Sequence, residues 1–483
     1  MDVVAKDIAP AEPAAVFTAF GPTLTKAIGY LLGAAGFLIG ARLIADNSFF
    51  THLATGRIIL DTGAVPTVDP YSATAAGEPW TVQSWFASAL YAGLEQTAGL
   101  WSLRVLNGLL CLATVAAIWR LTDEVQNMIV RFAIAAAPIA VGSVLWSPRP
   151  LLFGLLGLAL VLEVAAGRRP TWQVLPIMWV WVNTHGSFPL AGIAAGTLLV
   201  GRWLETRSTP SFELKVFGWV SLGTLLGAIN PLGLKVLTFP IELLGRREAL
   251  EGVNEWGPPA IWSIEFVAFA LLLGTAILVG LRTKSLVVLV PAIVFGASGL
   301  LAMRNLATAS LVLVAVAAPA LKNVKPGLNA TQGGLLARAM TVIAVCLVGL
   351  TVALSVAQGA LDLDSYPVAQ VDWLEERQLV ANPDVALAQG DDAGNYLELR
   401  FGADANVFMD DRFDFYPLDL VKDHLALAQD PDGIEVLDER SIDVVLWERA
   451  SVLEAAMLDD GRWQIVQSDD DWFVACRIAS AVC

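Results

Sequence analysis

Long runs of apolar residues recur along this sequence and restrict the folds that it can adopt. Several runs reach the roughly 20 residues that an α-helix needs to cross a bilayer. Hydrophobic residues make up 56% of the 483-residue chain and charged residues only 16%, whereas soluble domains usually contain about 25% charged residues. We therefore predict a polytopic α-helical membrane protein.

The apolar runs predict about 11 membrane spans. These are expected at residues 26–45, 103–120, 128–146, 149–166, 171–184, 187–204, 213–229, 260–281, 285–299, 305–321 and 336–357. The spans at 171–184 and 285–299 are short for a bilayer. The chain can bend or re-enter there, which would change the count by two.

Charge divides the chain into two main units. Residues 1–359 carry 18 acidic and 22 basic side chains, whereas residues 360–483 carry 28 acidic and 8 basic ones. We predict a cytoplasmic N-terminal segment (1–25), a transmembrane domain (26–359) and a small, acidic, soluble α/β domain (360–483). In this last domain we expect a helix at 367–379, strands at 405–411 and 442–449, and a hairpin formed by 462–468 and 472–478. Its acidic surface argues against nucleic acid as a partner, because phosphates would be repelled.

The positive-inside rule gives the orientation. With the N-terminus in the cytoplasm, 14 Lys and Arg residues fall on the cytoplasmic side and 8 on the opposite side. Eleven spans then place the C-terminal domain outside the cytoplasm.

The first outer loop, residues 46–102, is unusually long for a connection between two helices, and long loops often carry function. We predict two short amphipathic helices in it, at 47–62 and 81–98, lying in the membrane interface. The other outer loops hold the remaining polar clusters, so we expect the outer face to carry the chemistry. These clusters are SPRP (147–150), NTHGSFP (183–189), INPLG (229–233), NEWGPP (254–259) and MRN (303–305).

Asp46 follows the first span, where a carboxylate is costly unless it is hydrated, paired or used. It is a candidate general base, with the end of a helix as the simpler explanation. His52 is a candidate catalytic partner, and His185 is a candidate phosphate ligand; a structural hydrogen bond is the alternative for both. Glu255 is a second candidate carboxylate for substrate binding.

Three arginines at outer boundaries, Arg57, Arg149 and Arg304, are candidates for binding a donor phosphate, since guanidinium groups bind phosphate in a bidentate way. Snorkelling to lipid head groups is the alternative for each. Asp69, Tyr71 and Trp256 are candidate substrate-binding residues, although Trp also occurs at membrane interfaces without a ligand.

The segment FMDDRFDFYP follows a strand-like run, a place where α/β folds put ligands. Its charged residues are Asp410, Asp411, Arg412 and Asp414, and the favoured interpretation is a solvated acidic loop. The histidines and acidic residues show no zinc-ligand spacing, so a zinc site is not expected and no metal-binding residues are assigned.

Several motifs resemble those of a large group of bacterial membrane proteins related to C-type (GT-C, glycosyltransferase 39-like) glycosyltransferases. They are HLATGR (52–57), TGAVP (62–66), DPYS (69–72) and EPW (78–80), followed by the outer clusters given above and by GNYLELRF (394–401) and VFMDDRFDFYP (407–417). The resemblance implies a GT-C-like fold and a polyprenyl-phosphate sugar as donor. It also implies inversion at the anomeric centre, and it matches Asp46 to the catalytic acidic position. The Asp-Glu pair of that family is absent, because Asn47 follows Asp46.

From this resemblance we expect an inverting hexosyl or pentosyl transferase of the bacterial inner membrane. Its acceptor would be an envelope glycan, a lipid or a protein, and membrane lipids would surround it. No cofactor is assigned, and a divalent cation is the one candidate. The alternatives are a transporter or flippase for a lipid-linked polysaccharide, or a non-catalytic protein of polysaccharide assembly.

Overall fold

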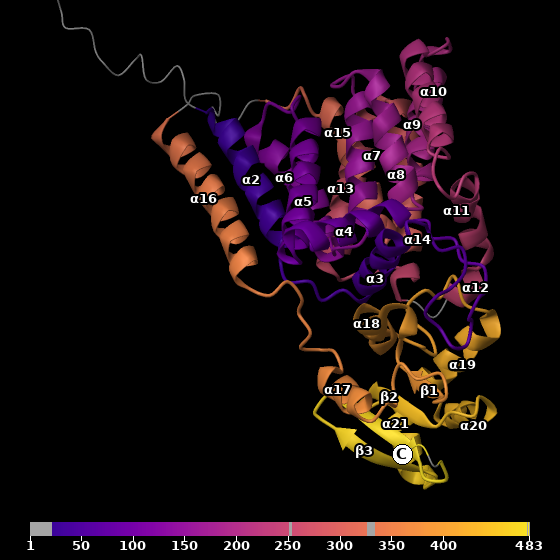
Figure 1. Cartoon of the computed structure of the whole chain (residues 1–483). Helices are drawn as coiled ribbons and strands as arrows, with labels where there is room; N and C mark the ends of the chain where they lie inside the picture. Colours follow the sequence, from indigo (N-terminus) through magenta and orange to yellow (C-terminus); the bar gives the residue numbers. More distant parts are fainter. Residues whose placement is uncertain (1–21, 251–253, 326–333, 481, 483) are drawn as a thin grey trace, which may run out of the picture.

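The computed structural model describes residues 22–250, 254–325, 334–480 and 482. It has a body of packed helices and, at one end of it, a smaller domain that contains the sheet (Figure 1). Most of the segment expected at 1–25 lies outside the described residues.

All eleven segments expected to span the membrane are helical. The corresponding helices are α2 (Leu24–Gly40), α5 (Trp101–Leu121), α6 (Met128–Leu145), α7 (Leu151–Ala165), α8 (Val174–Thr184, preceded by η1, Thr171–Gln173), α9 (Pro189–Thr206), α10 (Ser211–Leu226), α13 (Ile264–Thr283), α14 (Leu286–Leu301), α15 (Asn305–Ala320) and α16 (Leu335–Ala357). Shorter elements follow α10, namely α11 (Lys235–Gly245), α12 (Arg247–Leu250) and η2 (Asn254–Trp256).

Four described helices, α5, α6, α13 and α16, are long and apolar enough to cross a bilayer, and α2, α7, α14 and α15 are shorter apolar helices. The side of α16 that faces away from the bundle exposes large apolar side chains, such as Val345 and Leu350. Such a surface is stable in hydrocarbon and unfavourable in water. The body is therefore that of a membrane protein, while the count of 11 crossings stays a prediction.

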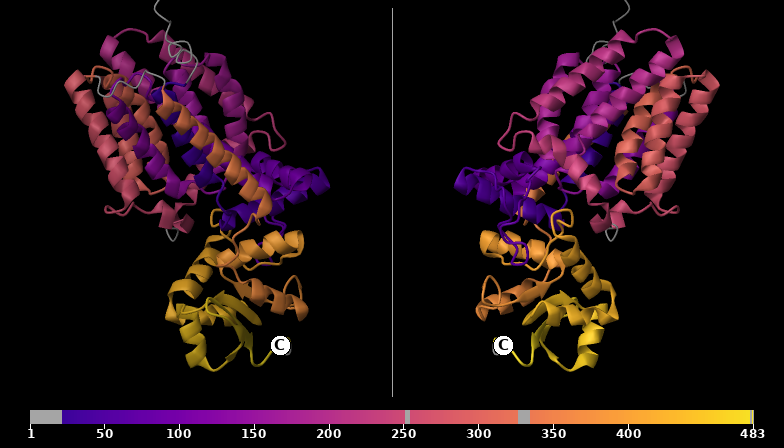
Figure 2. Two further views of the ribbon diagram at one scale, coloured as in Figure 1. Left: turned by 90° about the vertical axis from the view of Figure 1, so that its left-hand side faces the viewer. Right: turned by 90° about the vertical axis from the view of Figure 1, so that its right-hand side faces the viewer.

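Helices α3 (Asn47–Thr62) and α4 (Trp85–Ala98) occupy the positions expected for the two helices of the first outer loop. They lie across the end of the body that faces the C-terminal domain (Figures 1 and 2). Contrary to expectation, Phe49, Phe50 and Leu53 of α3 are fully buried in the protein. Phe49 packs on Tyr91 of α4, so tertiary packing rather than lipid covers this apolar face.

The two helices touch at Gly56. A Cβ at this position would lie 1.9 Å from the carbonyl oxygen of Ser88 on α4. Only glycine permits this approach, which sets the position of α3 and of the residues at its N-terminus.

The C-terminal domain is the expected α/β unit. Its elements are α17 (Val368–Glu376), β1 (Leu387–Gln389), α18 (Asp391–Phe401), η3 (Gly402–Asp404), α19 (Leu418–Gln429), η4 (Pro431–Glu435), α20 (Val436–Glu439), β2 (Val444–Glu448), α21 (Val452–Asp460), β3 (Trp463–Ser468) and β4 (Trp472–Arg477). The sheet has the order β1-β2-β4-β3. Strands β1 and β2 are parallel, while β4 is antiparallel to both β2 and β3. The helix at 367–379, the strand at 442–449 and the C-terminal hairpin are confirmed.

The prediction of a strand at 405–411 is wrong. This segment joins no sheet and forms one isolated bridge, between Val407 and Ser72 of the first outer loop. Its backbone hydrogen bonds go to that loop, from Val407 N to the Tyr71 oxygen (3.0 Å) and from Ala73 N to the Val407 oxygen (2.8 Å). The segment therefore connects the C-terminal domain to the helical body.

A second connection lies where α2 and α16 end. Ile44 N donates to the Ala360 oxygen and Asp362 N donates to the Ile44 oxygen, both at 2.9 Å. The hydroxyl of Tyr366 donates to the Ala45 oxygen at 2.9 Å. These bonds hold the residues just before Asp46 against the start of the C-terminal domain.

Candidate functional site

A cavity of about 1420 Å³ lies where the helical body meets the C-terminal domain. It gathers side chains that are far apart in the sequence, including all three histidines of the chain, His52, His185 and His424. Seven of the ten predicted site residues line it: Asp46, His52, Arg149, His185, Glu255, Trp256 and Arg304. The remaining three, Arg57, Asp69 and Tyr71, are not among its lining residues.

Asp46 begins α3, and its carboxylate accepts a hydrogen bond from Phe49 N (3.3 Å), as an N-cap residue does. The Nε atom of Arg149 lies 2.9 and 2.8 Å from its two oxygens. The Nη1 atom of Arg149 lies 3.2 Å from Glu255 Oε1. Arg149 therefore bridges two predicted carboxylates from different loops.

Arg304 sits on the face of the Trp256 indole, with its Cζ atom 4.2 Å from the ring centroid. Among the described residues, the Arg304 guanidinium has no hydrogen bond or ion pair. Its backbone N donates to the Glu255 oxygen (3.2 Å), and Met303 N donates to the Gly257 oxygen (2.9 Å). These bonds fix residues 254–257 to residues 303–305. They involve only backbone atoms, so the five N–H donors of the Arg304 side chain are available to a ligand.

Burial keeps His52 and His185 uncharged. It lowers the pKa of His52 to about 4, and burial together with Arg304 lowers the pKa of His185 to about 3. The backbone N of Ser187 donates to His185 Nδ1 (3.2 Å), so the neutral ring carries its proton on Nε2. His52 Nδ1 lies 3.3 Å from the Ser88 hydroxyl. Both rings offer hydrogen bonds rather than positive charge.

Arg57 does not face the cavity, so its placement corrects the expectation that it contacts a donor phosphate there. Its Nε donates to Glu95 Oε2 at 2.8 Å, and its Nη1 donates to the Leu399 oxygen at 2.8 Å. It thus ties α3 to α4 and to the end of α18. Glu95 lies 38 residues away in sequence, and no local pattern marks this pair.

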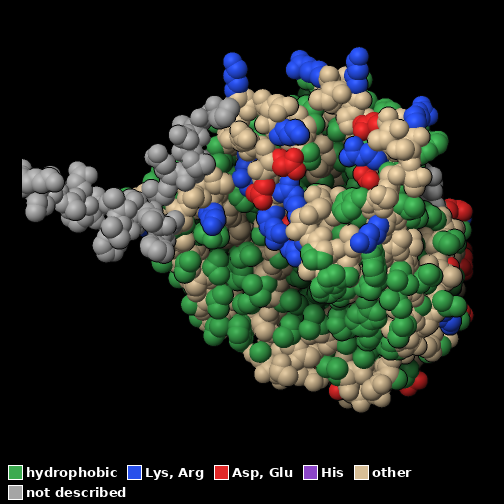
Figure 3. Space-filling model, turned by 90° about the horizontal axis from the view of Figure 1, so that it is seen from above, with side chains coloured by type: hydrophobic (Ala, Val, Ile, Leu, Met, Phe, Trp, Pro, Cys, Tyr) green, Lys and Arg blue, Asp and Glu red, His purple; other side chains and the backbone are tan. Residues whose placement is uncertain are grey.

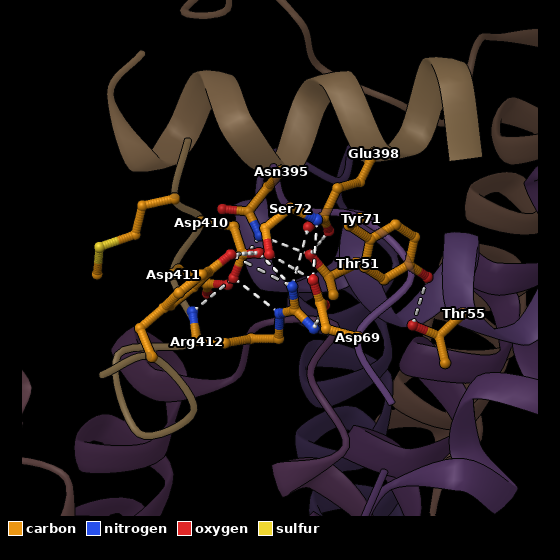
Figure 4. A network of polar contacts seen from close by, with 12 residues as sticks. Thr51, Thr55, Asp69, Tyr71, Ser72, Asn395, Glu398, Asp410, Asp411 and Arg412 are labelled. Carbon is orange, nitrogen blue, oxygen red and sulfur yellow. Dashed lines mark hydrogen bonds and ion pairs between the residues drawn. The ribbon is translucent and has the colours of Figure 1, made fainter. Parts of the chain in front are cut away.

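Asp69 and Tyr71 are buried beneath the cavity in a polar network centred on Arg412 (Figure 4). Arg412 Nη1 lies 2.8 Å from Asp69 Oδ1, and its Nε donates to Asp410 Oδ1 at 2.8 Å. The Tyr71 hydroxyl lies 2.8 Å from that of Thr55. The side chain of Asp69 therefore joins the first outer loop to the C-terminal domain, whereas the Tyr71 hydroxyl is bonded within that loop.

Glu398 of α18 also belongs to this network, with its Oε1 atom 3.5 Å from Arg412 Nη2. Burial and the neighbouring Asp410 raise its pKa well above the usual range. It accepts a hydrogen bond from the Thr51 hydroxyl. Burial alone would also raise the pKa of Asp410, but the Arg412 charge lowers it to about 2. Arg412 is thus paired with two carboxylates, Asp69 and Asp410.

The segment FMDDRFDFYP was interpreted as a solvated acidic loop, and this is wrong. Asp410 is fully buried, and Asp411 lines the cavity. The Ser48 hydroxyl and the Asn395 amide donate to Asp411. Asp391, Asp414 and His424 also line the cavity and were not predicted. For Asp414 the one sequence signal was the motif itself, whereas Asp391 and His424 lie outside every motif given above.

Within the described ranges, no group of three or more His, Cys, Asp or Glu side chains is placed to hold a metal ion. The structure defines a helical membrane protein whose soluble domain closes a polar cavity.

No family model and no curated protein matches the sequence. Among solved structures, the chain is similar to the archaeal oligosaccharyltransferase AglB from Archaeoglobus fulgidus in complex with an inhibitory peptide and a dolichol-phosphate. The TM-score is 0.49 at 11% identity, over 88% of this chain and 69% of that one. The apo form of the Archaeoglobus fulgidus oligosaccharyltransferase gives 0.47 at 12% identity, over 87% and 69%. Similarity at this level assigns neither a family nor an activity.

Proposed function

We propose that the protein transfers a sugar from a polyprenyl-phosphate donor to an acceptor bound in the cavity. One observation carries the proposal. A single cavity holds Arg149, Arg304 and Asp46 together, and it continues into an apolar wall on the membrane side. This combination suits an amphiphile with a phosphate head group.

The apolar wall is formed by two groups of residues. Leu190 and Ile193 lie on α9, and Phe239, Leu243 and Leu244 lie on α11. Ile193 and Leu244 are also exposed on the outside of the protein, so the wall extends from the cavity to the surface that faces lipid. A prenyl chain would remain in hydrocarbon there while its phosphate reaches the arginines.

The phosphate would be bound by Arg149, Arg304 and the Nε2–H of His185. Negative charge builds up on a phosphate leaving group as the bond to the sugar breaks, and arginine donors in a partly dry site stabilise that charge. A phosphate would compete with Asp46 for Arg149. Donor binding would therefore release the Asp46 oxygens when an acceptor needs a base.

In the transfer step, the acceptor hydroxyl oxygen attacks the anomeric carbon and its proton passes to Asp46. The bond between the anomeric carbon and the phosphate oxygen breaks, and polyprenyl phosphate leaves with the electron pair. A single displacement inverts the anomeric centre. His52, one and a half turns into α3 from Asp46, would orient the substrate as a neutral hydrogen-bonding group.

The site would face away from the cytoplasm in a bacterial inner membrane. Lys and Arg side chains stand on the end of the body opposite the C-terminal domain (Figure 3). Under the positive-inside rule that end is cytoplasmic. The product would then belong to the cell envelope, as a glycan, lipid or protein acceptor carrying the sugar.

The transporter alternative requires polar residues in use within the spans. Glu163 of α7 is fully buried, but it is paired with Arg120 and Arg169. Glu265 lies in the first turn of α13. Since neither is an unpaired charge in the middle of a helix, the geometry favours the enzyme. The assembly-protein alternative predicts that Asp46 is dispensable while residues 360–483 are required.

The test uses the full chain in lipid nanodiscs with a panel of polyprenyl-phosphate pentoses and hexoses. Release of polyprenyl phosphate is measured with and without a divalent cation. We expect turnover by the wild type, and a roughly 10²–10³-fold loss in Asp46→Asn and Arg149→Gln. Arg202→Gln, at the far end of α9, is the matched control and should retain activity. Full activity of Asp46→Asn would refute its role as the base, and absence of turnover with every donor would refute the function.

A further inference from the structure

The two sides of the cavity carry different balances of charge. The helical body contributes Arg42, Arg149 and Arg304 together with the carboxylates Asp46 and Glu255. The C-terminal domain contributes Asp362, Asp391, Asp411 and Asp414, and Arg412 is its one Lys or Arg among the described lining residues. Arg412 is already balanced by Asp69 and Asp410. The wall on the domain side is therefore negatively charged.

Two of these carboxylates have no cationic partner. Asp411 accepts hydrogen bonds from Ser48 and Asn395, yet neither Asp411 nor Asp414 forms an ion pair within the described residues. Burial and the nearby Asp410 raise the pKa of Asp411 to about 6, and burial raises the pKa of Asp414. Arg149 acts on Asp411, and Arg412 and Arg246 act on Asp414, but none of them forms an ion pair with these carboxylates in the part of the chain that the structure describes. Carboxylates in a partly dry site are usually paired, so a bound cation would be stabilised at this wall.

His424 gives an independent indication of a ligand. It lines the cavity and is only 2% exposed, and no described residue forms a hydrogen bond with its Nδ1 atom. Its Nε2 atom lies 3.6 Å from Asp391 Oδ1, and its ring packs on Trp447. A buried polar atom without a partner is rare in folded proteins. A bound molecule with hydroxyl or amine groups would satisfy it.

We propose that the wall formed by Asp391, Asp411, Asp414 and His424 is the acceptor subsite, and that the acceptor carries an ammonium group beside the hydroxyl that is glycosylated. This rests on the proposed function. The ammonium group would pair with Asp411 and Asp414, while His424 would bind a neighbouring hydroxyl. An anionic acceptor would be repelled from the same wall.

The opposite polarity of the two sides fits the order of the chemistry. The donor phosphate is drawn to the arginines of the body, and the acceptor cation is drawn to the carboxylates of the domain. The acceptor hydroxyl would then lie between them, near Asp46. Asp411 is held by Ser48, two residues after Asp46 on α3, so the two carboxylates share one helix end.

The test compares two probes that differ in one charge, methyl glucosaminide and methyl N-acetylglucosaminide. Their affinities for the full-length protein in nanodiscs are measured by calorimetry, without donor. We expect the amine to bind about tenfold more tightly, as charged hydrogen bonds are stronger than neutral ones. Asp411→Asn and Asp414→Asn should bring the ratio toward one. Asp470→Asn, in the exposed turn between β3 and β4, is the matched control and should leave it unchanged.

The pH dependence provides a second readout. Asp411 must be ionised to pair with an amine. The preference should therefore weaken as pH falls through about 6 in the wild type, a value that burial and Asp410 raise and that Arg149 opposes. This inflection should become smaller in Asp411→Asn, in which Asp414 remains. Equal binding of the two probes, or a preference that survives both substitutions, would overturn the proposal.

A transfer assay separates this inference from the proposed function. If the sugar is transferred equally well to both probes, the subsite is wrong and the function stands. If the amine binds selectively but no donor yields transfer, the function is wrong and the subsite stands. The same pair of head groups carried on an octyl chain in the nanodisc distinguishes a lipid acceptor from a soluble glycan.

Discussion

Arg149 holds both carboxylate oxygens of Asp46 through a single nitrogen, at 2.9 and 2.8 Å, and turns another nitrogen toward Glu255. Three loops that are distant in sequence meet at this guanidinium. A lysine in its place would keep the charge but not this planar fork.

Arg149→Lys is therefore expected to retain a part of the activity that Arg149→Gln loses. We predict that donor KM rises more than kcat falls, with an overall loss of roughly tenfold to a hundredfold, because one ammonium group cannot hold two carboxylates and a phosphate in the same geometry. Steady-state kinetics at varied donor concentration measure the split. A variant as active as the wild type would show that the planar fork of the guanidinium group is unimportant.

Trp256→Ala should weaken donor binding about two- to fivefold, because Arg304 loses the ring on which it rests. Trp262, which is 87% exposed, provides the control: Trp262→Ala should leave donor affinity unchanged. Binding of polyprenyl phosphate to each variant in nanodiscs is the measurement. Equal losses in both variants would point to a general effect on the membrane surface.

Arg412→Met should destabilise the C-terminal domain by about 3–5 kcal/mol, because Asp69 and Asp410 would be left buried without their cation. Glu398→Gln should be much closer to wild type, since burial and Asp410 raise the pKa of Glu398 and so disfavour its charge, and an amide can still accept the hydrogen bond from Thr51. Thermal unfolding and limited proteolysis of the full chain in detergent compare the two. A strongly destabilised Glu398→Gln would mean that this carboxyl is ionised in the fold.

The histidines predict a loss of stability in acid. The folded pKa of His52 is about 4 and that of His185 about 3, below the unfolded value of about 6.5. Between these values the unfolded chain binds more protons than the folded chain, so the free energy of unfolding falls as pH falls from about 6.5 toward 4. The dependence should become shallower in His52→Asn and His185→Asn, as measured by thermal unfolding across that range. An unchanged slope would show that these rings are accessible to protons.

Gly56→Ala should separate α3 from α4, because the added methyl group would overlap the Ser88 carbonyl. We expect lower thermal stability together with reduced transfer, since Asp46 and His52 both lie on α3. Gly93 on α4 has open space around it, so Gly93→Ala is the matched control and should be neutral or slightly stabilising. Normal stability of Gly56→Ala would contradict the close packing of these helices.

The sequence predicted the helices of the body well, because burial in lipid requires long apolar segments and these are visible without tertiary information. The sequence also predicted α3, whose N-cap residue is Asp46. Strand β1 was missed because it has only three residues. The segment 405–411 was taken for a strand because of its apolar residues, but these residues are buried against a loop instead of a sheet.

The structure brings seven of the predicted site residues to one cavity. What the sequence could not reveal was pairing. Arg57 and Arg149 look alike as boundary arginines, yet one is neutralised by Glu95 and the other faces the cavity. Likewise, nothing local in DPYS or FMDDRFDFYP shows that Asp69 and Arg412 meet.

The cavity is bounded by residues from near both ends of the chain, from Asp46 to His424. During synthesis, the first carboxylate of the site emerges early, and its opposite wall is made only after the last membrane helix has been completed. A chain that stops before residue 424 can insert its helices but has no complete cavity. The site is thus assembled late, which makes any activity of this protein a property of the finished chain.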